Sequence, residues 1–311
     1  MIHYMPHKEI DRAKWDACMD RATNSLVYGY SFYLDIMART WDALVMDDYT
    51  YVMPLPSRKK MGLPYLFQPF LTPCLGVFGE DPDIETVHAF IKAIPAKYKL
   101  WDISFNFQNR LDPGTAHQYR RENFVLSLVP SYEQLQSGYS KNLSRNINKA
   151  QGSGLEVKRG IDLSDIVKIC REEWPSFTQI EPGNFEGIIN NARVFTPWLK
   201  TYGVSIPGQD EWLATCAFLV YGRRAYYWLV GNRTAAKATG ASPLLLDQFI
   251  RDHAGSGLLL DFEGSDKKTI AEFYQRFGAS EQPFTTLYQN RLPFPMNLLK
   301  PTPRYYRALP S

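Results

Sequence analysis

Hydrophobic positions along the chain follow two spacings, one typical of helices and one typical of strands. Apolar residues that recur every three or four positions predict helices. Short aliphatic and aromatic runs bounded by Gly, Pro, Asn or Asp predict strands. Helices are expected at residues 10–21, 30–40, 83–94, 131–150, 163–173, 183–193, 243–254 and 268–277. Strands are expected in a hairpin at 41–60 and at 63–79, 99–107, 123–129, 155–160, 199–206, 211–222, 224–232, 257–264 and 284–290.

The order of these elements repeats once along the chain. Each half begins with helices, continues with a strand meander and ends with a helix and further strands. This order predicts a mixed α/β (α+β) protein with two similar domains, one over residues 1–130 and one over 131–311.

The amino-acid composition excludes fewer classes of function than the order of the predicted elements does. The 311 residues carry a formal net charge of +3, so no overall field indicates a nucleic-acid partner. The four cysteines are far apart and the first residues lack an apolar leader, which predicts reduced thiols and a cytoplasmic protein. No metal site is expected, because the five histidines lack metal-ligand spacing, and no apolar run is long enough to span a membrane.

The predicted helix around "SKNLSRNINKAQ" has a basic face. At about 100° per residue, Lys141, Arg145 and Lys149 lie on one side, opposite Leu143 and Ile147. Two interpretations stay open. The basic face is either simply solvated, or it binds the phosphates of a substrate, a coenzyme or an RNA end.

The segment "GNRTAAKATGASP" predicts a tight turn and a helix start. Gly240 suits the turn, Ser242 suits the cap and Pro243 suits the first helical turn. The unpaired N–H groups of such a helix start attract anions, and Arg233 and Lys237 would add positive charge. The segment is therefore either a pyrophosphate site or an ordinary capped helix.

The segment "DFEGSDKKTIAEFYQRFG" places two carboxylates at the end of a predicted strand. Alternation puts Asp261 and Glu263 on one face and Phe262 on the other. If poorly solvated, the two acids would raise each other's pKa, and one would suit a base for an ammonium nucleophile. In the alternative interpretation, a buried arginine or backbone amides hold Asp261, and Glu263 is solvated.

The following helix is expected to begin at a capping box of Thr269 and Glu272, with Ser265 or Asp266 as alternative caps. Its apolar stripe is predicted to face the core. The stripe consists of Ile270, Phe273, Tyr274 and Phe277.

Together, these motifs over about residues 131–292 resemble the second domain of the FemXAB-like peptidyltransferases, which belong to the acetyltransferase (GNAT) superfamily. For the first half, the resemblance extends to element order alone. It implies two tandem GNAT-like domains, each a twisted mixed sheet flanked by helices, with a substrate groove between them. It also implies transfer of an aminoacyl group from a charged tRNA to an amine of a peptidoglycan precursor. Acyl-CoA-using relatives share the domain.

The resemblance also implies roles for individual residues. In the family, a Phe-Lys pair precedes a Phe-Gly pair on the helix after the acidic strand end. Here Phe273 matches the phenylalanine, whereas Tyr274 stands at the lysine position. The role of stabilising an oxyanion would then fall to backbone amides where the strand after Arg223 leaves its neighbour, with the Tyr274 hydroxyl or Arg276. Asp261 or Glu263 would be the base.

Substrate contacts are expected from two further groups. Of the adjacent residues Tyr226 and Tyr227, one is expected to line the groove and the other to lie in the core. The acetyltransferase pyrophosphate pattern is met loosely by Lys237, Gly240 and Ser242.

Two other functions stay open. One is an acyl-CoA-dependent N-acyltransferase, and the other is a non-catalytic binding protein on the same fold, which the Tyr274 departure favours. No tightly bound cofactor is expected. The partners would be an acyl-CoA or aminoacyl-tRNA donor and a small or peptide-bearing amine acceptor, and no oligomeric state is predicted.

Overall fold

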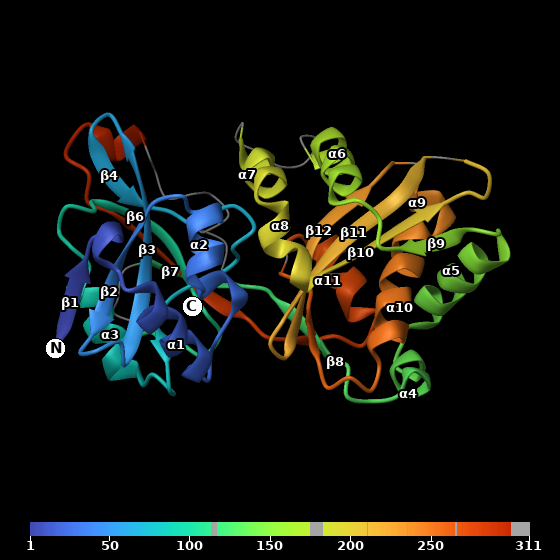
Figure 1. Cartoon of the computed structure of the whole chain (residues 1–311), viewed down its shortest axis with the longest axis horizontal. Coiled ribbons are helices and arrows are strands. Elements are labelled where there is room, and N and C mark those ends of the chain that lie inside the picture. Colours follow the sequence, from blue (N-terminus) through green and yellow to red (C-terminus); the bar gives the residue numbers. More distant parts are fainter. Residues whose placement is uncertain (113–116, 175–182, 210, 235, 265, 300–311) are drawn as a thin grey trace. The chain divides into compact units, whose positions relative to one another are not determined.

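The computed structural model describes residues 1–112, 117–174, 183–209, 211–234, 236–264 and 266–299. The chain forms two compact units, each with one mixed sheet and flanking helices (Figure 1). The first unit combines residues 1–121 with a return segment that starts at Pro283, and the second unit is Glu122–Gln282.

The first unit is built on a sheet in which one neighbouring pair, β4–β6, is parallel and the other pairs are antiparallel. The strand order is β1 (Ile2–Met5), β2 (Trp41–Met46), β3 (Tyr51–Lys60), β4 (Leu63–Leu66), β6 (Leu100–Phe105), β15 (Phe284–Asn290) and β7 (His117–Arg121), with β5 (Phe78–Gly79) beside β3. The helices are α1 (Arg12–Arg21), α2 (Ser31–Met37) and α3 (Ile84–Ala93). The side chains of Phe90 on α3, Phe105 and Leu287 are fully buried in its core.

The second unit is built on a sheet in which only β12–β13 is a parallel pair among the described strands. The strand order is β14 (Ser280–Glu281), β8 (Phe124–Ser127), β13 (Leu259–Asp261), β12 (Arg224–Asn232), β11 (Trp212–Tyr221), β10 (Leu199–Ser205) and β9 (Glu156–Arg159). The helices are α4 (Tyr132–Ser137), α5 (Lys141–Gly152), α6 (Leu163–Glu173), α7 (Asn184–Asn190), α8 (Ala192–Phe195), α9 (Ala236–Thr239), α10 (Ala241–His253) and α11 (Lys268–Gln275).

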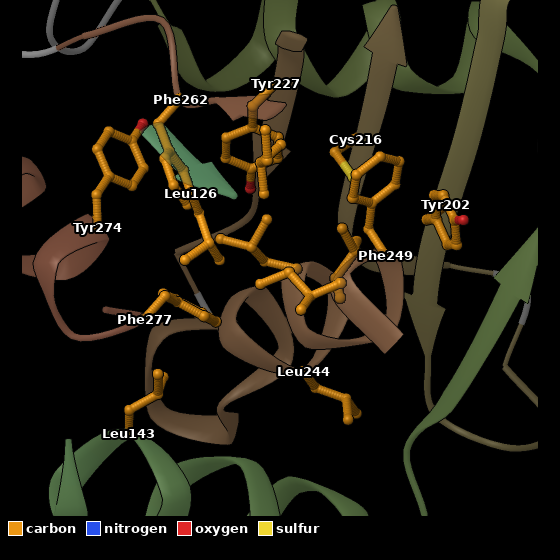
Figure 2. Close-up of a cluster of buried hydrophobic side chains, with 14 of the residues drawn as sticks. Leu126, Leu143, Tyr202, Cys216, Tyr227, Leu244, Phe249, Phe262, Tyr274 and Phe277 are labelled. Atoms are coloured by element: carbon orange, nitrogen blue, oxygen red, sulfur yellow. The ribbon is translucent and has the colours of Figure 1, made fainter. Parts of the chain in front are cut away.

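An aromatic core joins α10 to the second sheet. The rings of Phe249 on α10 and Phe218 on β11 are stacked with centroids 3.6 Å apart, and Tyr227 stacks on Phe218 at 5.0 Å (Figure 2). The apolar face of α5 packs on the same cluster through Leu143 and Ile147, as the amphipathic pattern predicts.

Several element boundaries differ from the sequence prediction. The helix expected at 131–150 is divided into α4 and α5, because the hydroxyl of Ser140 accepts the N–H of Leu143 and caps a new helix. The helix expected to start at a capping box of Thr269 and Glu272 instead begins at Lys268 and has no side-chain cap. The alternative cap Ser265 lies outside the described residues. Strands β1, β7 and β14 were not predicted.

The two units also divide the chain differently from a boundary near residue 130. Strand β8 pairs with β13 in the second sheet, whereas the late strand β15 lies between β6 and β7 in the first sheet. This difference arises because a strand's hydrophobic pattern shows that it is buried but not which sheet it joins.

All four cysteines lie in the described part of the chain, where they are buried and form no disulfide. Within the same residues, no helix has the length and apolarity needed to cross a membrane. No group of three or more His, Cys, Asp or Glu side chains in those residues is arranged to hold a metal ion.

Candidate functional site

Strands β12 and β13 run side by side for only three residue pairs. The pairing begins at Arg224 opposite Leu259 and ends at Tyr226 opposite Asp261. The next residue, Phe262, donates its N–H to the carbonyl of Phe124 on β8 at 3.0 Å, so the chain turns away from β12. Among the described strands, only β11 pairs with β12 beyond this point. Beyond Tyr226, this edge of β12 therefore faces no described strand.

A bulge lies on β12 where the two strands part. Tyr227 pairs with Phe218 and Leu229 pairs with Ala217, so Trp228 is an extra residue on this strand. A bulge of this kind re-aims backbone groups and side chains next to it. The Trp228 side chain is buried against Phe195, with ring centroids 4.9 Å apart.

Asp261 is fixed at the end of β13 by three donors. Its carboxylate accepts Nη1 of Arg224 at 2.5 Å, Nδ2 of Asn123 at 3.1 Å and the backbone N–H of Glu263 at 2.9 Å. The side chains of Arg224 and Asp261 are 12% and 6% exposed, so this is a buried ion pair. The geometry matches the alternative in which an arginine and a backbone amide hold Asp261. The sequence did not point to Arg224, since an arginine at the start of a strand gives no sign of its partner.

Glu263 does not continue the strand, so the expected alternation of Asp261 and Glu263 on one strand face is wrong. The strand ends at Asp261, and Glu263 and Gly264 both have positive φ, of 60° and 71°. A side chain at Gly264 would bring a Cβ within 2.6 Å of the Glu122 carbonyl oxygen. A left-handed non-glycine residue is uncommon and is characteristic of functional turns. Glu263 is half-buried.

Tyr274 lies against this turn from α11. Its ring stacks on Phe262 with centroids 4.6 Å apart, and the Tyr227 ring lies 6.4 Å from each of them (Figure 2). Burial, followed by the negative charges of Glu263 and Asp261, raises the pKa of the Tyr274 hydroxyl. The hydroxyl is therefore a proton-bearing donor, close enough to both acids to sense their charge.

The other aromatic candidates are mainly packing residues. Tyr226 and Tyr227 are both buried in the whole chain, and the expectation that one of them lines a substrate groove stays a prediction. Phe273 is half-buried and packs edge-on against Phe277 at 5.3 Å. Arg276 ends α11, and its carbonyl accepts the Ser140 N–H at 2.9 Å.

The basic face of α5 is exposed, as its pattern predicts. Lys141, Arg145 and Lys149 are all exposed. Arg145 donates to Oδ1 of Asn142 at 2.9 Å, and Lys149 lies 3.4 Å from the carbonyl oxygen of Ala238. The structure thus brings the end of α5 to the segment before α10.

The start of α10 offers little room for a phosphate. Gly240, with φ +76°, is the N-cap, so the expectation that Ser242 caps the helix is wrong; its hydroxyl donates to Asn232 Oδ1 at 2.7 Å instead. Ala241 gives its N–H to the Thr239 hydroxyl, and Pro243 has none. Of these first three residues of α10, Ser242 alone keeps an available backbone N–H.

Of the two basic residues expected near this helix start, the structure describes the side chain of Arg233 but not that of Lys237. Arg233 binds Glu172 at 3.1 Å and the carbonyl oxygen of Trp212 at 3.1 Å, so its guanidinium is already engaged. The side chain of Lys237 lies outside the described residues.

No protein-family model matches the chain, and no curated protein matches its sequence. Similarity to solved structures is extensive. The crystal structure of FemX aligns over 96% of this chain and 99% of its own, with a TM-score of 0.65 and 11% identity. L-PGS from Bacillus licheniformis aligns over 93% and 95%, with a TM-score of 0.53 and 9% identity. A tandem GNAT protein from the clavulanic acid biosynthesis pathway aligns over 93% and 98%, with a TM-score of 0.50 and 11% identity. The chain therefore has the two-domain FemXAB/GNAT fold.

Proposed function

We propose that the protein is a transferase that moves an acyl or aminoacyl group from an ester or thioester donor to an amine acceptor. The observation that carries this proposal is the parting of β12 and β13 beside the left-handed turn at Glu263. Beyond Tyr226, where β13 no longer pairs with it, β12 supplies backbone N–H groups in a fixed geometry, and the adjacent turn supplies a carboxylate. Acyl transfer needs these two components, an oxyanion donor and a base.

The reaction that these groups support is direct. The amine nitrogen attacks the donor carbonyl carbon, a C–N bond forms, and the carbonyl electron pair moves to oxygen. Backbone N–H groups of β12 beyond Tyr226 donate to this oxyanion. Glu263 takes the proton of the attacking amine and, as the intermediate collapses, passes it to the departing alcohol or thiol of the donor.

Neighbouring residues take supporting roles in this proposal. Asp261 is a positioning residue, because its carboxylate accepts the Glu263 N–H and holds the turn. The Tyr274 hydroxyl, kept protonated by its surroundings, is a second donor to the oxyanion. Arg276 stays a predicted alternative for that donor.

For the donor, we favour an aminoacyl-tRNA, with a peptidoglycan precursor amine as acceptor and the cytoplasm as the compartment. The exposed cations of α5 support this choice, since they form a phosphate-binding face of several residues. The alternative donor is an acyl-CoA. Its support is the left-handed Gly240 cap and the available Ser242 N–H, which form a smaller phosphate site.

A thermal-shift panel distinguishes the donors. An aminoacylated tRNA minihelix should raise the melting temperature more than acetyl-CoA does, because a ligand that binds only the folded state stabilises it. The R145M/K149M variant should lose this shift and reduce the salt dependence of binding by about one per removed contact. The matched control is R193M/K200M, which removes one exposed arginine and one exposed lysine elsewhere in the second unit.

Three outcomes revise the proposal. A shift from acetyl-CoA alone would establish the thioester donor instead. Equal loss of the shift in R145M/K149M and in the control would remove α5 from the donor site. Binding of the charged minihelix without transfer would favour the non-catalytic alternative, which the buried position of Tyr274 in place of the family lysine supports.

A further inference from the structure

The first unit contains a cavity unrelated to the β12–β13 site. Its volume is about 520 Å³, within the range of small-molecule pockets. It is lined by the C-terminal half of α3, the segment that leads into β6 and the end of β15.

Four basic side chains and one acid, Asp112, line this cavity. His88 and Lys92 are four residues apart on α3 and so lie on the same side of the helix. Lys99 and Arg291 face each other on neighbouring strands, because the Arg291 N–H donates to the Lys99 carbonyl at 2.7 Å. The positive charges of Lys99 and Arg291 repel each other at this spacing. One unfavourable pair of cations, with Lys92 and His88 beside it, therefore lies at the cavity.

Protein carboxylates do not compensate these basic residues. In the part of the chain that the structure describes, none of the four basic side chains takes part in an ion pair. The nearby Lys97 differs, since its Nζ lies 3.6 Å from the carboxylate of Asp42. Lys92, Lys99 and Arg291 are exposed at the cavity, so a ligand from solution can reach them.

The floor of the cavity is apolar except for one donor. Ile91, Ile94 and Trp101 are buried, and the Trp101 indole N–H is already bound to the Tyr98 carbonyl at 2.8 Å. The amide nitrogen of Gln289 is also buried, and it has no acceptor among the described residues. A buried donor without an acceptor indicates that an oxygen from outside the chain satisfies it.

We propose that this cavity binds a small organic phosphate. The phosphoryl oxygens lie against Lys92, Lys99 and Arg291, where they relieve the repulsion between Lys99 and Arg291. The carbon body lies on the apolar floor at Trp101, and one ligand oxygen accepts the Gln289 amide. This site does not depend on the proposed transferase function.

Calorimetric titration of the full-length protein with phenyl phosphate tests the proposal, with inorganic phosphate and phenol as comparison ligands in low-salt, phosphate-free buffer. Phenyl phosphate should bind with a dissociation constant below about 1 mM and at least about fivefold more tightly than inorganic phosphate. Phenol should not bind measurably. The K99M/R291M variant should lose at least about tenfold in affinity, whereas R193M/K200M should stay within about twofold.

Circular dichroism confirms that each variant is folded, and R291M alone replaces the double variant if the latter does not fold. The proposal fails if the wild type does not bind phenyl phosphate, or binds it no more tightly than inorganic phosphate. It also fails if K99M/R291M, or R291M in its place, binds phenyl phosphate as tightly as the control does.

Discussion

Asp261 and Glu263 show how two neighbouring carboxylates acquire different roles. Asp261 accepts three hydrogen bonds and pairs with Arg224 in a buried site, so its geometry is that of a structural acid. Glu263 stands in a left-handed turn that Asp261 itself stabilises. In the proposed mechanism, this rigid neighbour would hold the Glu263 carboxylate in a fixed position for proton transfer.

At the residue scale, replacing Asp261 with asparagine should lower the free energy of unfolding by about 3–5 kcal/mol, because it leaves the Arg224 charge buried without its partner. Chemical denaturation measures the effect. The control is D162N, an exposed carboxylate that makes no capping hydrogen bond, and it should stay within about 0.5 kcal/mol of the wild type. Equal effects of the two variants would show that the Arg224 pair does not contribute.

A second residue-scale prediction concerns pH. Burial disfavours the Asp42 carboxylate, but hydrogen bonds from Tyr4, Tyr98 and the His7 N–H, with the charge of Lys97, outweigh it and lower the Asp42 pKa. A pKa lowered in the folded state stabilises the fold above the unfolded value of about 4, and this stability is lost as the pH falls through the folded value.

The variant D42N should therefore be less stable than the wild type by about 2–3 kcal/mol at pH 7, and the difference should shrink below about pH 4. Urea denaturation at both pH values measures it. A difference that is the same at both pH values would mean that the Asp42 charge does not account for it.

Residue identities in this site were only partly predictable. Alternation, the rule that put Asp261 and Glu263 on one face, holds while a strand continues, and the left-handed Glu263 ends it. The interaction of Asp261 with Arg224 joins residues 37 positions apart, so only the fold reveals it. The roles of Glu263, Tyr274 and Arg276 in transfer stay predictions.

At the element scale, the close contact between α5 and α10 is the feature that shapes the phosphate candidates. Gly240 lies so near α5 that a Cβ there would be 2.8 Å from the Asn146 carbonyl oxygen. The α5 backbone therefore occupies one approach to the α10 start and leaves less room for an anion there.

The variant G240A should lower the free energy of unfolding by more than G257A does. The two glycines have nearly the same φ, +76° for Gly240 and +75° for Gly257, so alanine strains the backbone similarly at each. Gly257 has open space around it, whereas Gly240 meets α5. We expect about 1 kcal/mol for G257A and about 1–2 kcal/mol more for G240A. If denaturation experiments give the same loss in the free energy of unfolding for both variants, α5 moves aside without destabilising the fold.

Elements with a strong apolar period were predictable, and those defined by neighbours were not. The two faces of α5 follow from its sequence, since Leu143 and Ile147 are buried and Lys141 is exposed. Strand β14, with two residues, has too short a pattern to detect, and its pairing with β8 fixes it. The bulge at Trp228 likewise depends on the partner strand.

At the scale of the whole molecule, the fold is retained with little sequence in common. FemX shares 11% of aligned residues with this chain and still superposes with a TM-score of 0.65. The repeated element order predicted two mixed sheets, because periodicity depends on residue class rather than identity. The sheet assignment of β8 and β15 was not predictable, because both are short buried runs that fit either sheet.

The chain path makes a prediction about fragments. Residues 122–282 are continuous and contain every strand of the second sheet, so this fragment should fold cooperatively by itself. Residues 1–121 should not fold alone, because they lack β15, which lies between β6 and β7 and supplies the buried Leu287. Circular dichroism and thermal melts of the two fragments measure this; a cooperative transition of 1–121 would contradict the assignment of β15.

The most direct test of the transfer mechanism is the single-turnover rate at which the wild type and E263Q move a labelled aminoacyl group. The donor is a charged tRNA pool, the acceptor is a nucleotide-linked peptide with a free amine, and E156Q is an exposed control. The account predicts that E263Q lowers the rate about 10²–10⁴-fold with an unchanged melting temperature, while E156Q behaves as the wild type. Transfer by E263Q at the wild-type rate would contradict it.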